Sequence, residues 1–337
     1  LSGPANSWPL NNRGRTHTPP ASCFDYDVLM LKRSSKSGFM PNAYVFPGGM
    51  LDSSDFSSEW LDIFKDFSNS PSFGLRRVKQ RVETRPPIFA TDRLKLGSPI
   101  PGEVAFRICA LRETFEESGV LLLCSDELSR WRTLVNQNPS NFVRMCRELE
   151  VLPNIWALHE WSNWLTPAGT YGGTRFDTAF FICCLQEIPH TLQDQREIVR
   201  FQVLQSYQAE EFWIAPPQFY ELSRMCRFPL HKDLHKFSSQ RATEGCEQWL
   251  PVVTKDEHNT PVSLLPGDKL YPMDSSGGAE ECISTDRELK DCQDSGLHRM
   301  LFLGSHIINL QITIAPKYNH LLPVIGEALP HDLDSQL

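Results

Sequence analysis

The sequence contains no apolar run of the ~18 residues that a membrane-spanning helix needs. It also lacks a basic excess, since 33 Lys and Arg residues stand against 41 Asp and Glu residues and give a formal charge of −8. A sequence-independent nucleic-acid binder needs a basic face, so this balance argues against that class. The charge balance does not exclude a small anionic substrate, because binding one needs only a local cluster of Arg or Lys. We therefore expect a globular protein without a membrane segment.

The ten cysteines include no C-x-x-C pair, so the sequence gives no indication of a structural zinc site. Cys183 and Cys184 are adjacent inside an apolar run, and Cys109 lies in a segment with helical periodicity. These positions are typical of buried, reduced thiols rather than of a disulfide framework. With 337 residues, of which 40% are hydrophobic, the chain is long enough to bury a substantial core without such crosslinks.

The alternation of periodic segments predicts an α/β (α+β) protein. Residues 1–22 are rich in Pro, Asn, Ser and Thr, which predicts a flexible lead-in. The irregular stretch 50–102 is typical of an inserted segment that is ordered at most in part. We expect strands at 24–32, 43–46, 120–124, 176–185, 199–203 and 301–315, and helices at 103–117, 126–164, 219–226 and 234–250. The spacing of Trp156, Trp161 and Trp164 predicts a packed face of the second of these helices.

The helix predicted at 103–117 places three carboxylates together. Glu113, Glu116 and Glu117 share one face, and Gly119 stands where a helix C-capping glycine would stand. Carboxylates so close repel one another unless a cation neutralises them. A hard divalent ion with oxygen ligands would do so. An isolated E-x-x-E-E pattern is more often a solvated acidic face, so the surrounding sequence must decide.

The surrounding sequence resembles the Nudix box, G-x5-E-x7-R-E-U-x-E-E-x-G-U, where U is apolar. Residues 112–120 (RETFEESGV) match its second half, with Thr114 in place of an apolar residue, and residues 47–49 (PGG) match its start. Residues 50–102 separate the two halves, which implies an insertion within the box. Two residues are candidates for the first Glu of the box. Asp55 has the expected spacing from Gly49, whereas Glu103 is one residue away from the expected spacing to Arg112.

A second segment resembles the Nudix hydrolases that act on coenzyme A. Their pattern, L-L-T-x-R-S-x3-R-x3-G-x3-F-P-G-G, is matched by residues 30–34 (MLKRS) and 46–49 (FPGG), with Gly38 and Asn42 replacing its second Arg and its Gly. Residues 105–109 (AFRIC), 176–181 (FDTAFF) and 216–220 (PPQFY) extend the resemblance over most of 24–320.

The resemblance implies a Nudix α/β/α sandwich with a mixed sheet, an insertion inside the box, and additional helices plus C-terminal strands. The expected organisation is a flexible segment at 1–22, a Nudix hydrolase domain at 23–230 with insertions at 50–102 and 126–164, a C-terminal extension at 231–325 packed on that domain, and a tail at 326–337.

The resemblance also implies roles for individual residues. Glu116 and Glu117 would be the principal ligands of Mg²⁺ or Mn²⁺, and Glu113 would be a further ligand or would activate water. Arg112 would hold these carboxylates by charge-assisted hydrogen bonds. Contacts to the substrate are expected from Arg33, Lys32, Gly48 and Gly49. Glu197 is the candidate for an additional catalytic carboxylate, with Glu210 and Glu211 as competitors.

The implied activity is hydrolysis of the pyrophosphate bond of coenzyme A and its thioesters, giving 3′,5′-ADP and (acyl-)4′-phosphopantetheine. A Nudix hydrolase of another substrate (NADH, ADP-ribose or an RNA cap) is the first alternative. The second is a non-catalytic nucleotide-binding protein, which the altered early position of the box keeps open.

The final tripeptide, Ser335-Gln336-Leu337, resembles the peroxisomal address S-K-L. Taken alone, the tripeptide is more often an ordinary tail. Together with the resemblance to the coenzyme A hydrolases, it predicts a peroxisomal import receptor as a partner and a peroxisomal location, with cytosol or mitochondrion as alternatives.

Overall fold

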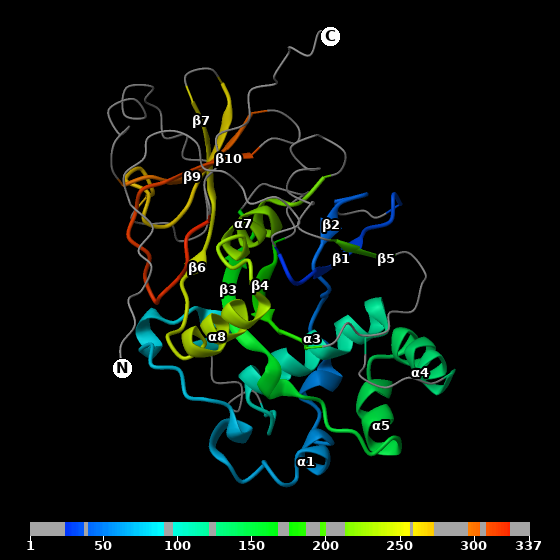
Figure 1. Ribbon diagram of the computed structural model, residues 1–337. Helices are drawn as coiled ribbons and strands as arrows, with labels where there is room; N and C mark the ends of the chain where they lie inside the picture. The colour runs from blue at the N-terminus through cyan, green and yellow to red at the C-terminus, as the bar shows by residue number, and fades with distance from the viewer. Residues whose placement is uncertain are drawn as a thin grey trace.

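A computed structural model of the chain describes residues 24–36, 40–90, 97–120, 126–167, 175–186, 196–199, 213–256, 259–272, 296–303 and 308–323 (Figure 1). The predicted lead-in at 1–22, most of the strand at 120–124, Glu210, Glu211 and the tail at 326–337 lie outside these residues. Helices and strands alternate along the described chain, which confirms the mixed α/β prediction. None of the described helices has the length and apolarity needed to cross a membrane.

The described strands form three sheets, whose orders are β2-β1-β5, β4-β3-β6 and β10-β9-β8-β7. The first sheet is antiparallel, with Leu31 opposite Val45 and Met30 opposite Glu197. In the second, β6 runs parallel to β3, so the C-terminal part of the chain adds a strand to a sheet begun much earlier. The strands are β1 Val28–Lys32, β2 Tyr44–Val45, β3 His159–Leu165, β4 Asp177–Ile182, β5 Arg196–Val199, β6 Gln248–Trp249, β7 Val252–Lys255, β8 Pro261–Leu264, β9 His298–Phe302 and β10 Ile308–Ile312.

The longest described helix, α3, runs through the middle of the molecule between the β3–β4 strands and the α4–α5 pair (Figure 1). It ends at Gly119, whose φ of +62° only glycine adopts easily and whose N–H donates to the Phe115 carbonyl at 2.7 Å. The predicted C-cap is therefore confirmed. The helices are α1 Trp60–Ile63, α2 Pro87–Ala90, α3 Gly102–Ser118, α4 Asp126–Gln137, α5 Asn141–Glu148, α7 Pro216–Met225 and α8 His231–Arg241.

The insertion at 50–102 is more ordered than its irregular sequence predicts. Trp60, Phe64 and Phe73 from this stretch are buried in one apolar cluster with Phe115 of α3 and Phe142 of α5. Each such side chain contributes roughly 1.5–3 kcal/mol through burial, although no helix here exceeds one turn. In the described part of the insertion, tertiary packing thus provides the order that its sequence periodicity does not indicate.

A second apolar cluster joins described segments that are far apart in the sequence. It contains Met30 of β1, Trp161 of β3, Phe219 of α7 and Met300 of β9. The four-stranded C-terminal sheet therefore shares a core with the strands that precede α3 and with the β3–β4 sheet.

The helix predicted over 126–164 is wrong beyond residue 148. Two helices, α4 and α5, are followed by a 3₁₀ turn, Ile155–Ala157, and then by β3. Trp161 and Trp164 are packed as expected, but on a strand. Since β3 is buried on both faces, its sequence shows no apolar–polar alternation. The helix predicted over 234–250 likewise ends at Arg241, before a turn at Gly245 and strand β6.

Cysteine usage agrees with the expectation of reduced thiols. The six cysteines in the described residues are all unpaired, and Cys109, Cys146, Cys226 and Cys246 are buried.

Candidate active site

The glycine turn that follows β2 lies directly against the acidic half of α3. The Gly48 N–H donates to Glu117 Oε2 at 2.9 Å. A Cβ atom on Gly49 would overlap the Glu113 carboxylate, so a residue with any side chain cannot occupy this position without moving it. The two halves of the predicted box, far apart in sequence, therefore meet at Gly48 and Gly49.

Arg112 is buried at the centre of this arrangement. Its Nε and Nη2 donate to the two oxygens of Asp55 at 2.9 and 3.0 Å, a bidentate pair. Its Nη1 donates to Glu113 Oε1 and to Glu116 Oε1, both at 2.8 Å. Nη2 also donates to the Met50 carbonyl at 3.0 Å, which fixes the chain just after the glycine turn. One guanidinium thus holds two of the three predicted metal ligands at a single nitrogen.

The structure separates the two candidates for the early acidic position. Asp55, with only 1% of its surface exposed, faces Arg112 and sits on the 3₁₀ turn Ser53–Phe56. A capping box places it there, because Asp52 accepts from the Ser54 N–H while Asp55 accepts from the Asp52 N–H. Glu103 instead pairs with Arg85 at 2.9 Å. Asp55 therefore occupies the early position and is bound to Arg112.

Burial and the neighbouring negative charges raise the pKa of two carboxylates of α3, Glu113 and Glu117. Burial raises the pKa of Glu117 to about 7, with the charges of Glu113 and Glu116 adding to the effect and the Gly48 N–H and Arg33 opposing it. Burial also raises the pKa of Glu113, against the lowering effect of Arg112. Positive charge is thus in deficit at this end of the helix.

These residues have the chemistry that a hard divalent cation requires. All three donors are carboxylate oxygens, and Arg112 engages one oxygen of Glu113 and one of Glu116, which leaves the second oxygen of each for another partner. Within the described residues, however, no three His, Cys, Asp or Glu side chains are already gathered at metal-binding spacing. A cation would thus draw together carboxylates that now only share a helix face.

The remaining predicted site residues lie in different parts of the structure, and one of them lines a cleft beside the carboxylates. Arg33 lines the same cleft as Glu113 and Glu117, whereas Lys32 lies over the ring of Tyr44, 5.7 Å from its centroid. Glu197 is placed on β5 opposite Met30. Its catalytic role stays a prediction.

Sequence reasoning missed one residue that shapes the site. Arg132 of α4 donates from Nε to the Glu116 carbonyl at 2.8 Å and from Nη2 to the Glu117 carbonyl at 3.1 Å. It thereby satisfies carbonyls that the last turn of any helix leaves free. Nothing in the sequence marks this residue, because the contact depends on how α4 folds back onto α3.

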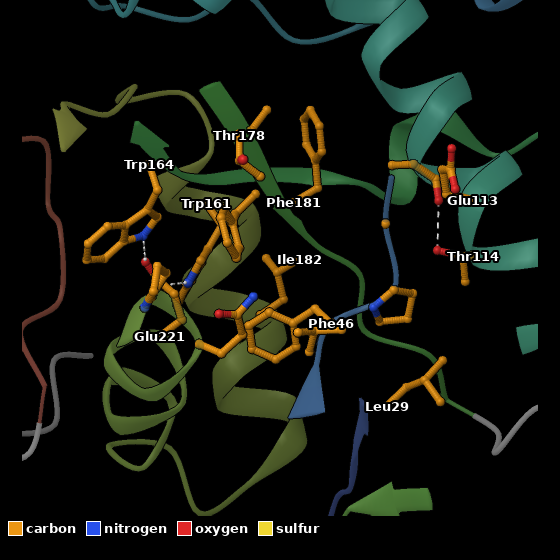
Figure 2. Close-up of a pocket in the computed structure, with 18 of the residues that line it drawn as sticks. Leu29, Phe46, Glu113, Thr114, Trp161, Trp164, Thr178, Phe181, Ile182 and Glu221 are labelled. Atoms are coloured by element: carbon orange, nitrogen blue, oxygen red, sulfur yellow. Dashed lines mark hydrogen bonds between the residues drawn. The ribbon is translucent and has the colours of Figure 1, made fainter. Parts of the chain in front are cut away.

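A single cleft of about 2310 Å³ extends from the carboxylates across the molecule, well above the ~300–1,000 Å³ of an ordinary small-molecule site. Figure 2 shows Glu113 on one side of it, Trp161, Trp164 and Glu221 on the other, and Phe46 and Ile182 between them. The reactive end of the cleft is therefore continuous with a long apolar region.

A carboxylate-bearing helix set against a glycine turn, within a mixed α/β fold, defines a metal-using hydrolase of the Nudix class. The family model for the NUDT19 Nudix domain matches residues 6–225, and the model for the NUDT19 C-terminal domain matches residues 252–313. The chain belongs to the NUDT19 family of Nudix hydrolases. It is thus a Nudix pyrophosphohydrolase, and such enzymes generally use divalent metal ions.

Curated relatives cover nearly the whole chain. A Xenopus laevis protein named acyl-coenzyme A diphosphatase NUDT19 is 46% identical over 335 residues, which is 90% of this chain and 87% of that protein. Proteins of the same name from Gallus gallus and Homo sapiens are 45% and 39% identical, over 96% and 93% of this chain and 94% and 91% of their own lengths. Among solved structures, a Nudix hydrolase from Alicyclobacillus acidocaldarius aligns with a TM-score of 0.44 and 21% identity, over 62% of this chain and 87% of that one.

Proposed function

We propose that this protein hydrolyses the pyrophosphate bond of coenzyme A and acyl-coenzyme A, giving 3′,5′-ADP and (acyl-)4′-phosphopantetheine, with Mg²⁺ or Mn²⁺ as its cofactor. The observation that carries the proposal is the meeting of Arg112, the glycine turn and the three carboxylates at one end of a long cleft. The names of its relatives and the coenzyme A pattern at residues 30–49 support this substrate.

In this proposal Glu113, Glu116 and Glu117 hold the metal, which when bound neutralises the diphosphate and acidifies a water molecule. Arg112 keeps Glu113 and Glu116 oriented, since both accept from its Nη1. Gly49 allows the turn to pack directly against the Glu113 carboxylate, so the backbone of the turn helps to hold this proposed ligand in place. Glu113, whose pKa is raised by burial, or Glu197 would accept the proton of the attacking water.

A substrate panel tests the proposal. Coenzyme A, an acyl-coenzyme A, NADH, ADP-ribose and capped RNA are incubated with and without Mg²⁺ or Mn²⁺, and the products are identified by mass. We expect metal-dependent release of 3′,5′-ADP from the two coenzyme A substrates. Cleavage of NADH, ADP-ribose or capped RNA with coenzyme A left intact would overturn the substrate, and binding without any turnover would overturn the activity.

Conservative variants test the residues. Glu116→Gln and Glu117→Gln should each lower kcat by about 10²–10⁴-fold, the range expected when a group that stabilises the transition state is removed. Glu148→Gln is a matched control, because Glu148 lies on the surface of α5 in an exposed pair with Arg144. Full activity in both α3 variants would contradict the assignment of the metal ligands.

We further propose a peroxisomal location, on the basis of the Ser335-Gln336-Leu337 tail and its import receptor. Residues 326–337 fused to a fluorescent reporter should give a punctate signal that overlaps a peroxisomal marker, as a Ser-Lys-Leu control does. A diffuse signal beside a punctate control would contradict this location.

A further inference from the structure

Beyond the carboxylates the cleft becomes apolar and aromatic. We call this part the aromatic arm and define it by Phe46, Trp161, Phe180, Ile182, Gln218 and Glu221, which all line the cleft. Phe46 and Phe180 meet edge to face with 6.1 Å between ring centroids. Phe180 and Ile182 point to one side of β4, because alternate residues of a strand share a face. The aromatic arm thus has walls from β3, β4, α7 and Phe46, the residue that follows β2.

Glu221 contributes no free charge to the aromatic arm. Its carboxylate accepts from the indole N–H of Trp161 at 2.7 Å and of Trp164 at 2.8 Å, and it pairs with Arg224 at 2.5 Å. All of these partners are buried. The pair and its hydrogen bonds satisfy the acid, so this end of the cleft behaves as a neutral wall.

Unlike Glu221, Gln218 has a buried polar atom without a hydrogen-bond partner among the described residues. It is the third residue of α7, and the unpaired atom is its Oε1. Leaving a buried polar group unpaired costs about 1–3 kcal/mol, so the group needs a partner, and at the wall of a cleft a bound ligand can supply one. An apolar site with one well-placed amide is suited to fix the orientation of an otherwise apolar ligand.

The charges around the cleft distinguish the two halves of the proposed substrate. Six acidic side chains and two arginines, with no lysine, line it among the described residues. The 3′,5′-ADP half carries several phosphate charges, and the residues that define the aromatic arm offer it no cation, since the one acid among them, Glu221, is already paired with Arg224. The acyl-pantetheine half is uncharged, aliphatic and contains two amides, which matches an apolar cleft with one unpaired amide.

We propose that the aromatic arm binds the acyl-pantetheine half of the substrate and that the Gln218 side chain hydrogen-bonds one of its amides. Gln218 is then a positioning residue for the substrate and not a catalytic one. This inference rests on the proposed hydrolysis of coenzyme A.

Product inhibition of Gln218→Leu tests the inference, because the two products separate the two halves of the substrate. The change keeps the size of the side chain and removes its amide. Gln240→Leu, at an exposed position of α8 outside the cleft, is the matched control. Inhibition constants for 4′-phosphopantetheine and for 3′,5′-ADP are measured against coenzyme A turnover in the wild type and both variants.

We expect Gln218→Leu to raise the inhibition constant of 4′-phosphopantetheine and the KM of coenzyme A by roughly three- to ten-fold, the effect of one lost hydrogen bond. The inhibition constant of 3′,5′-ADP and kcat should stay within two-fold. Gln240→Leu should change none of them.

Two results would overturn the inference while the proposed function stands: an effect of Gln218→Leu on 3′,5′-ADP alone, which would place the nucleotide in the aromatic arm, or no effect on either product. If the wild type does not cleave coenzyme A, the proposed function fails first, and direct binding of 4′-phosphopantetheine to both variants still decides the role of Gln218.

Discussion

Arg112 has an unusually large number of partners for one side chain. It binds Asp55 on the first turn of the insertion, the backbone after the glycine turn and two carboxylates of its own helix. A buried guanidinium with this many anionic partners is stable only while all of them remain. Removing one therefore affects the others through the charge left behind.

Asp55→Asn should lower the free energy of unfolding by about 3–5 kcal/mol, because it leaves the buried Arg112 without its bidentate partner. Asp52→Asn is the control. It changes the N-cap of the same 3₁₀ turn, and because Asn caps a helix about as well as Asp, it should cost less than about 0.5 kcal/mol. Chemical denaturation with metal chelated measures both, and equal losses would show that the ion pair contributes little beyond the turn.

Glu117 gives the metal-free protein a pH dependence of defined sign. The pKa of Glu117 is raised to about 7 in the folded state. The protonated side chain therefore contributes to stability below the pKa that Glu117 has in the unfolded chain, and this contribution is lost as the pH rises through about 7. In chelator at pH 8, Glu117→Gln should be more stable than the wild type by on the order of 1–2 kcal/mol, and near pH 4.5 the difference should vanish.

Thermal melts across this pH range, with Glu148→Gln as the surface control, measure the effect. Adding Mg²⁺ at pH 8 should make the wild type more stable than Glu117→Gln, since only the wild type gains a cation on the Glu117 carboxylate. If the wild type stays more stable than Glu117→Gln in chelator at pH 8, the carboxylate is better compensated than its burial implies.

At the scale of elements, the packing of α4 on α3 sets the end of the metal-binding helix. Arg132→Met removes two hydrogen bonds to the last carbonyls of α3 and should cost about 1–2 kcal/mol. It should also raise the metal concentration needed for half-maximal activity, because Glu116 and Glu117 lie in the turn that loosens. Arg130→Met, at an exposed position of α4, should change neither quantity in denaturation and metal-titration assays.

Elements could be predicted from the sequence where local rules suffice. Helix α3 has helical periodicity and a glycine cap, and its three carboxylates follow from spacing alone. Strand β3 has buried polar residues such as Glu160 and Asn163 among its tryptophans, and no local pattern separates it from a helix. The choice between Asp55 and Glu103 needed the fold, because the partner of each acid is an arginine distant in sequence.

At the scale of the whole molecule, the C-terminal sheet is part of the core that supports the cleft. Arg224 of α7 donates to the Leu321 carbonyl at 2.7 Å, and Arg227 donates to the carbonyls of Leu322 and Pro323. Met300 of β9 is 1% exposed and packs in the same cluster as Trp161. The sheet and the site should therefore unfold together.

Met300→Ala should lower the free energy of unfolding by about 2–5 kcal/mol and still give a single transition by calorimetry, with metal-dependent activity lost at the same temperature as the fold. Leu303→Ala changes a neighbouring residue that is 49% exposed and should have an effect within about 0.5 kcal/mol. A second, separate transition in Met300→Ala would show that the sheet unfolds independently.

The Asp55–Arg112 contact closes a ring of chain that contains nearly the whole insertion. Closing such a ring costs conformational entropy that grows only logarithmically, by about 0.6 kcal/mol for each doubling of the loop. The length of the insertion therefore has little effect on the free energy of unfolding. Insertions of other lengths should be tolerated so long as Trp60, Phe64 and Phe73 still pack in the cluster with α3. Kinetics are more sensitive, because contacts distant in sequence form late. The active site should be among the last parts of this protein to assemble, well after α3 has formed.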